Sequence, residues 1–153
     1  MLQDVAVHPI RPDVVLLDRL ESHPLDISAI REAAVRLVSA DRLSDAFNLV
    51  ADALEKAQDS QELLALIALI CEASFNWSGA AAYLERLIRI QGEHAPAETL
   101  SHWVRVLRCQ GHLDQALDVA SRSLQIYPDH PMLVSEFQTL SSIRSVQIKK
   151  AGA

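Results

Sequence analysis

Apolar residues along this chain recur at spacings of three and four positions, with polar residues between them. Two such runs are Ala46, Leu49, Val50, Ala53 and Leu54, and Ala116, Val119, Ala120 and Leu124. This spacing places the apolar side chains on one face of an α-helix and differs from the alternation of a half-buried strand. The breaks between runs are short, and short links join helices that run antiparallel. We therefore predict an all-α chain.

The stretch 97–130 has an order of features that also occurs in 61–94 and 27–60. Large apolar residues come first, a turn follows at Gly111, small residues follow at Ala116, and Pro128 comes after the second helix. Ala80 and Ala46 take the place of Ala116 in the other two copies. This pattern resembles the tetratricopeptide repeat, a unit of about 34 residues that forms two antiparallel helices.

The copies depart from the family pattern at a few places. The second copy has Phe75 in place of the turn glycine and Gly92 in place of the closing proline, where the first copy has Gln58. The insertion Ala95-Pro96 separates the second copy from the third. The register is supported by residues that favour helix N-caps. The expected caps are Asp26, Ser44, Ser60, Ser78 and Asp114.

The two ends of the chain have different patterns. Residues 131–148 carry apolar residues at helical spacing, which predicts a capping helix that covers the last repeat, with Asp129 as its N-cap. Residues 1–26 form an N-terminal segment in which 13–20 could add a short helix. The resemblance therefore implies an α-α superhelix, a solenoid of three helical hairpins (27–60, 61–94 and 97–130) with a C-terminal capping helix, in a single domain.

Charge and hydropathy exclude several classes of protein. The chain has 153 residues, a formal net charge of −6 and an isoelectric point near 5.4, so it lacks the excess basic charge of a general nucleic-acid binder. The longest apolar run, Leu63 to Cys71, has nine residues, and about 20 are needed to span a bilayer. We expect no membrane insertion. The N-terminus lacks the pattern of a signal peptide, so we expect a cytoplasmic protein.

No pattern typical of catalysis occurs in the sequence. We find no nucleophile motif, no glycine-rich phosphate loop and no zinc-binding His-Glu-x-x-His. Two cysteines cannot form a disulfide framework or a tetrahedral zinc site. We expect no catalytic residue, metal or cofactor, and we expect Cys71, Trp77 and Trp103 to be structural. An enzyme with an unrecognised site is the least favoured alternative.

The resemblance also implies a candidate binding groove, because the first helices of stacked repeats line a concave face. The residues at the lining positions are Arg31, Val35, Ala65, Leu66, Leu69, Glu98, His102, Arg105 and Arg108. The middle of this surface is apolar and the third repeat is basic, so we expect an apolar anchor of a partner at Leu66 and Leu69. Arg105 and Arg108 would then meet an acidic flank of the same partner.

Some family members hold the C-terminal carboxylate of chaperones with Lys, Asn and Arg residues. Here Val35 and Leu66 stand where such a clamp has Asn, and Glu98 stands where it has Lys, so the resemblance does not extend to a carboxylate clamp. An apolar protein segment, helical or extended, fits better. We expect a small chaperone or adaptor. The alternative is a permanent structural subunit bound through its outer faces, and homodimerisation stays open.

Overall fold

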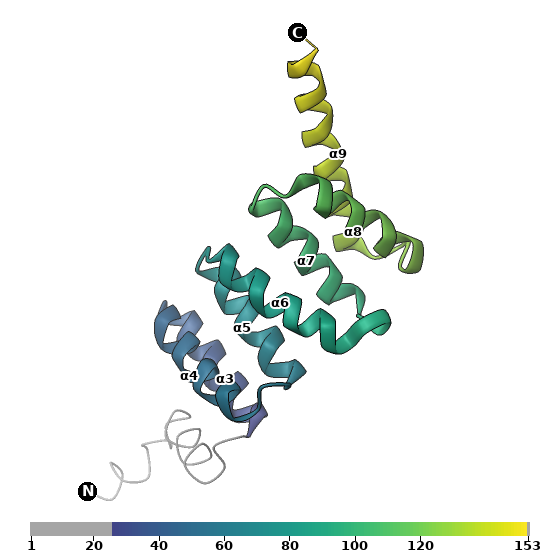
Figure 1. Cartoon of the computed structure of the whole chain (residues 1–153). Helices are drawn as coiled ribbons and strands as arrows, with labels where there is room; N and C mark the ends of the chain where they lie inside the picture. Colours follow the sequence, from purple (N-terminus) through teal and green to yellow (C-terminus); the bar gives the residue numbers. More distant parts are fainter. Residues whose placement is uncertain (1–25, 153) are drawn as a thin grey trace, which may run out of the picture. The chain divides into compact units, whose positions relative to one another are not determined.

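This computed structural model describes residues 26–152, whose regular structure is entirely helical (Figure 1). The α-helices are α3 (Ile27–Ser39), α4 (Leu43–Lys56), α5 (Gln61–Ala73), α6 (Trp77–Gln91), α7 (Ala97–Cys109), α8 (Leu113–Ile126) and α9 (Pro131–Ala151). A short 3₁₀ helix, η1 (Gly92–His94), follows α6. Residues 26–152 contain no strand, so the all-α prediction is confirmed. The short helix expected at 13–20 lies outside the described residues.

The contacts between the described residues divide the chain into two compact units, a first unit that ends at Leu66 and a second that begins at Ile67, and the boundary lies within α5. In the first unit α3 packs against α4, with Ile30 and Val50 fully buried. In the second unit α7 packs against α6, α8 and α9, and α8 also packs against α9 (Figure 1). The second unit therefore consists of successive helices that each pack on their sequence neighbours.

Three alanines that the repeat pattern aligns are fully buried. Ala46 of α4, Ala80 of α6 and Ala116 of α8 have no exposed surface. Each lies in the first turns of the second helix of its hairpin. A larger side chain at such a position would have to displace the packed neighbours, which explains why the same small residue recurs.

Two of the expected N-caps are confirmed and four are wrong. The side chain of Asp26 accepts a hydrogen bond from the backbone N–H of Ala29 (3.1 Å), and Ser60 Oγ accepts one from that of Leu63 (3.3 Å). In contrast α4, α6 and α8 begin before the expected caps Ser44, Ser78 and Asp114, and the residue preceding α9 is His130 instead of Asp129.

The cap of α6 is Asn76, whose Oδ1 accepts a hydrogen bond from the backbone N–H of Gly79 (3.0 Å). Asn76 and Ser78 are both good caps by residue type, so type alone could not choose between them. α9 starts directly at Pro131, because a proline at the first helical position has no N–H to leave unpaired.

The last helix has a packed half and an exposed half. Leu133, Glu136 and Leu140 of α9 are buried, whereas its residues from Arg144 onward are exposed. Figure 1 shows this second half projecting away from α7 and α8. The helix continues past residue 148, where we expected it to end, to Ala151.

Candidate functional site

Four of the expected groove residues lie in the first unit. Arg31 and Val35 are one turn apart on α3, and both are exposed. Arg31 Nη2 lies 3.9 Å from Glu62 Oε2 in a solvated ion pair. Ala65 and Leu66, at the start of α5, are half-buried. In this unit the predicted residues therefore include one exposed apolar side chain, Val35.

Five expected groove residues lie in the second unit: Leu69, Glu98, His102, Arg105 and Arg108. Leu69 belongs to the most apolar helix of the described chain, and most of its apolar neighbours on α5 are buried. Leu69 is nevertheless 46% exposed, and it is the exposed large apolar side chain of α5. Leu69 therefore provides the exposed apolar surface of this helix.

The arginines of α7 bind a carboxylate of α9. Arg108 Nε lies 2.7 Å from Glu136 Oε2, and Arg108 Nη2 lies 3.3 Å from Glu136 Oε1. Arg105 Nε donates to the same Oε1 at 3.2 Å. Both oxygens of the nearly buried Glu136 carboxylate therefore accept hydrogen bonds from guanidinium groups. Hydrogen bonds between two charged groups are among the strongest in proteins.

A second buried carboxylate, Glu72 of α5, extends this arrangement. His102 Nδ1 lies 3.0 Å from Glu72 Oε2, and Arg105 Nη1 lies 4.0 Å from Glu72 Oε1. Arg105 thus lies between the two glutamates. We call Glu72, His102, Arg105, Arg108 and Glu136 the charge cluster, which links α5, α7 and α9.

The protonation state of Glu136 follows from these contacts. Burial alone would raise the pKa of Glu136, but the hydrogen bonds from Arg108 and then Arg105, with the charges of both arginines, hold that pKa below its ordinary value. The same hydrogen bond raises the pKa of Arg108. Glu136 and Arg108 are therefore both ionised near neutral pH, and the cluster is an ion-pair network that fixes α9 to α7.

This geometry gives Arg105 and Arg108 a structural role that the sequence analysis did not predict. Both arginines have a partner within the chain, Glu136, and their contact with an acidic flank of a bound protein stays a prediction. The sequence did contain a signal that Glu136 needs a cationic partner, although not which one. Glu136 lies between Leu133 and Leu140 on the apolar face of the capping helix, and a carboxylate at such a position must be neutralised when it is buried.

Two of the other residues considered for chemistry lie in the core. Trp103 and Cys71 are buried, as predicted, and burial together with the charge of Glu72 raises the pKa of the Cys71 thiol to about 11. Thiols with such a pKa are poor nucleophiles. Within residues 26–152 no group of three His, Cys, Asp or Glu side chains could hold a metal ion. None of the helices in that range combines the length and the apolar character of a membrane span.

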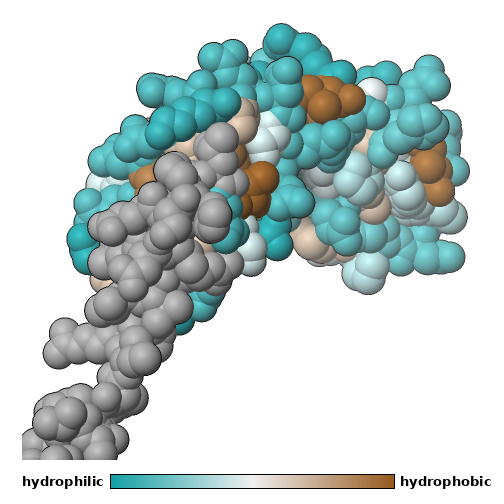
Figure 2. All heavy atoms as spheres, turned by 90° about the horizontal axis from the view of Figure 1, so that it is seen from below, coloured by the Kyte–Doolittle hydropathy of each residue, from teal (hydrophilic) through white to brown (hydrophobic). Residues whose placement is uncertain are grey.

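Exposed apolar residues are scattered over the described surface. They are Val35, Leu69, Phe75, Ile90, Ile126, Val146 and Ile148. On the face that Figure 2 shows, the hydrophobic residues form small separate patches on a mainly hydrophilic surface. On that face the hydrophobic residues therefore do not join into one extended apolar patch.

No protein-family model matches the chain, and no curated protein matches it either. Solved structures do match. The first TPR domain of human RPAP3 is 10% identical, with 80% of this chain and 95% of that chain covered and a TM-score of 0.69. MamA is 12% identical over 90% of this chain and 74% of that chain, with a TM-score of 0.71. YrrB, described as "a TPR protein with an unusual peptide-binding site", is 14% identical over 88% of this chain and 68% of that chain, with a TM-score of 0.69. These similarities establish the fold.

Proposed function

We propose that this chain, which has the fold of the tetratricopeptide-repeat domains, is a cytoplasmic, non-enzymatic module that binds an apolar segment of another protein as a small chaperone or adaptor. The repeats would be 27–60, 61–94 and 97–130, with 131–148 as the cap. The proposed contact residues are Arg31, Val35, Ala65 and Leu66 in the first unit, and Leu69, Glu98, His102, Arg105 and Arg108 in the second.

The observation that carries the proposal is the exposure of Leu69. Its neighbours Ile67, Ala68 and Ile70 are buried and pack α5 against the rest of the second unit. The side chain of Leu69 therefore remains available to a partner. Burial of a leucine side chain against a partner contributes roughly 1.5–3 kcal/mol. A few buried side chains carry most of the binding energy of an interface, and we propose Leu69 as one of them.

The charge cluster favours an apolar ligand over an acidic one. Two similar TPR domains are bound to the peptides SGPTIEEVD and SRMEEVD, which end in acidic residues. In this chain Arg105 and Arg108 already bind Glu136, and Glu98 is exposed nearby on the same helix. An acidic peptide would have to displace Glu136 and approach Glu98, whereas an apolar segment requires neither.

The alternative, a permanent structural subunit bound through its outer faces, is supported by another exposed residue. Ile90, on the second helix of the middle hairpin, is 39% exposed, which is similar to Leu69. Leu69 and Ile90 therefore provide a matched pair for distinguishing the two proposals, because they lie on different helices of the same hairpin.

The test is site-specific photocrosslinking in cells that contain the protein. A photoreactive amino acid replaces Leu69 in one variant and Ile90 in the other, and the captured proteins are identified by mass spectrometry. We expect a specific product from position 69 and none from position 90. A specific product from position 90 alone would overturn the proposal in favour of the subunit.

Exchange then separates a chaperone or adaptor from a subunit. Labelled partner is added to the purified complex, and the bound label is measured over time. Replacement of the bound partner on a scale of minutes supports the chaperone or adaptor. A complex of fixed stoichiometry that does not exchange within a day supports the structural subunit.

A further inference from the structure

Two helices that carry predicted groove residues, α5 and α7, run parallel to each other. Each is joined to α6 by a short link, and short links join antiparallel helices, so α5 and α7 point in the same direction. Within the second unit His102 of α7 lies beside Glu72 of α5, with 3.0 Å from Nδ1 to Oε2. Leu69 precedes Glu72 by three positions, and Glu98 precedes His102 by four. Each step is one helical turn, so Leu69 and Glu98 occupy neighbouring positions on the two helices.

Glu98 is a carboxylate without a partner. It is exposed, and no cation pairs with it among residues 26–152. Glu72 and Glu136 differ from it, because both are buried and both contact Arg105. With Arg108, this face of the second unit holds three carboxylates and two guanidinium groups. One negative charge is therefore in excess, and it is exposed at Glu98.

The second nitrogen of His102 is a hydrogen-bond acceptor. An ionised carboxylate can only accept hydrogen bonds, so the Nδ1 that faces Glu72 carries a proton. In a neutral imidazole Nε2 is then the acceptor. No hydrogen bond joins this Nε2 to another residue in the described part of the chain, and 24% of the His102 side chain is exposed. The position beside Leu69 therefore offers two acceptors, the Glu98 carboxylate and Nε2 of His102.

We propose that the segment bound at Leu69 carries a lysine or arginine close to its apolar residue, and that this cation binds Glu98 and His102. The inference rests on the proposed function, because it assumes that Leu69 contacts a partner, and it adds a charge requirement. Ammonium and guanidinium groups have several N–H donors and no acceptor, so one such group can donate to both side chains. An acidic side chain at the same place is repelled by Glu98 and has no proton to donate to His102.

The geometry of the two helices also limits the spacing of the residues in the partner. Packed helices lie about 8–10 Å apart, so the apolar and the basic side chain must leave the partner on the same side. Side chains share a side when they are two positions apart in an extended segment, or three or four apart in a helix. We expect one of these spacings.

Selection from a phage-displayed library of random peptides by the full chain tests the proposal without a known partner. We expect the enriched peptides to combine an apolar residue with Lys or Arg at one of these spacings. Glu98→Lys should replace the enriched basic residue by Asp or Glu. Glu93→Lys is the matched control, since it makes the same change in charge at an exposed residue that lines the groove between α6, α7 and α8. It should enrich the wild-type peptides, and both variants should keep the wild-type circular dichroism spectrum.

The affinity of the best wild-type peptide gives a second measurement with a milder change. Glu98→Gln should weaken binding by about two- to fivefold, as expected for the loss of one exposed ion pair. The difference should shrink at high salt, which screens exposed charges. When the basic residue of the peptide is replaced by glutamine, Glu98→Gln should have no further effect, because the two groups act as a pair.

The outcomes separate this inference from the proposed function. Enriched peptides with an apolar residue and no basic residue would overturn the inference, as would an acidic residue in place of the basic one. The proposed function stands in both cases if Leu69→Gln abolishes the selection. A basic preference that persists in Glu98→Lys would also overturn the inference, by assigning that preference to the net charge of −6. A selection that enriches no apolar residue, or no peptide at all, would overturn both.

Discussion

Arg108 of α7 binds Glu136 of α9 through two contacts, Nε to Oε2 at 2.7 Å and Nη2 to Oε1 at 3.3 Å. Such a paired contact fixes both the distance and the orientation of the two groups. Because Glu136 is buried, loss of its partner leaves a carboxylate that water cannot solvate fully. The pair should therefore determine how firmly the capping helix is held.

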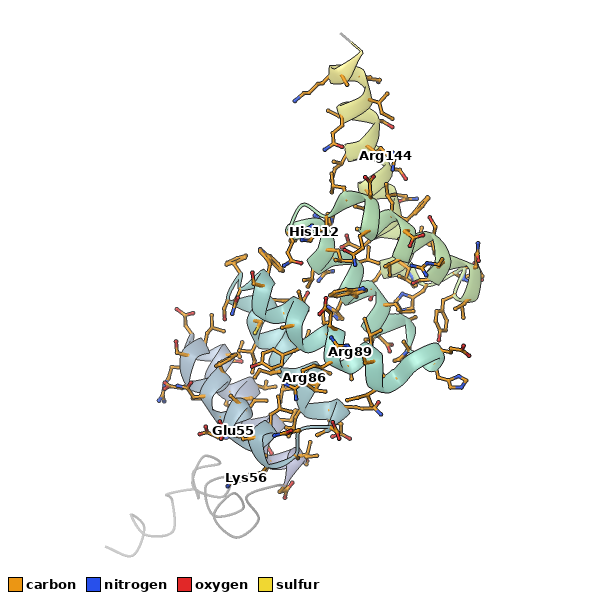
Figure 3. The ribbon with its side chains drawn as sticks, in the orientation of Figure 1. Glu55, Lys56, Arg86, Arg89, His112 and Arg144 are labelled. Carbon is orange, nitrogen blue, oxygen red and sulfur yellow. The ribbon has the colours of Figure 1, made fainter. Side chains whose placement is uncertain are left out.

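Arg108→Ala should lower the free energy of unfolding by about 1.5–3 kcal/mol, since hydrogen bonds to charged groups contribute that much. Arg105 continues to bind Glu136, which limits the loss. The matched control is Arg89→Ala on α6, labelled in Figure 3, whose pair with Glu85 (3.8 Å) is exposed. That change should alter stability by less than about 0.5 kcal/mol. Urea unfolding followed by circular dichroism measures both, and equal effects would show that the cluster does not hold α9.

Glu136 should also make stability depend on pH. Its pKa is lower in the folded protein than in the unfolded chain, so its contribution is complete above the ordinary glutamate value of about 4.3. That contribution is lost as the pH falls through the lowered pKa. Glu136→Gln does not titrate, so the stability difference between wild type and variant should shrink between pH 7 and pH 3. Urea unfolding at both values measures it, and a constant difference would contradict the assignment.

Ala116→Leu should overpack the start of α8 and lower the free energy of unfolding by roughly 1–3 kcal/mol. Ala116 is fully buried, whereas Ala82, on α6, is exposed and serves as the control. Ala82→Leu should leave the thermal midpoint within a few degrees of the wild type. If thermal unfolding of Ala116→Leu matches that of the wild type, the alignment of the three alanines has no packing significance.

Phe75 has a positive φ (57°) in the turn between α5 and α6, as Gly111 has (84°) in the turn between α7 and α8. Phe75→Gly should be more stable than Phe75→Ala by about 1 kcal/mol, because alanine keeps the strain of a positive φ and glycine does not. Both variants lose the ring and its edge-on contact with Trp77, so only the backbone differs. Gly111→Ala, in the corresponding turn, should lose a similar amount. Chemical unfolding of all three variants checks this, and an alanine variant as stable as the glycine variant would show that the turn is not strained.

The local features of this protein were largely predictable from sequence. Helical spacing gave the all-α architecture, and aligned small residues identified Ala46, Ala80 and Ala116, all of which are fully buried. Asp26 was recognisable as a cap from its residue type. At α6 residue type did not choose between Asn76 and Ser78, and the cap is Asn76.

The site was less predictable because its contacts join distant parts of the chain. Arg108 and Glu136 are separated by 28 positions, and no local pattern shows that they meet. Phe75 was visible as a departure from the turn glycine, but its exposure and positive φ depend on how the turn folds. Sequence spacing could place Arg105 and Arg108 on one helical face, but it could not show that α9 supplies their partner.

The central claim is that Leu69 anchors an apolar segment of another protein. The most direct test is to purify the partner identified by photocrosslinking and to measure its affinity for two matched variants. Leu69→Gln and Ile90→Gln each remove one exposed apolar side chain, and glutamine adds no charge near Glu72. Burial of one leucine side chain contributes roughly 1.5–3 kcal/mol to the binding free energy, so its loss should weaken the affinity by about tenfold or more. Isothermal titration calorimetry should show this weakening for Leu69→Gln and almost none for Ile90→Gln, with both variants fully helical. Normal binding by Leu69→Gln together with weakened binding by Ile90→Gln would contradict the account.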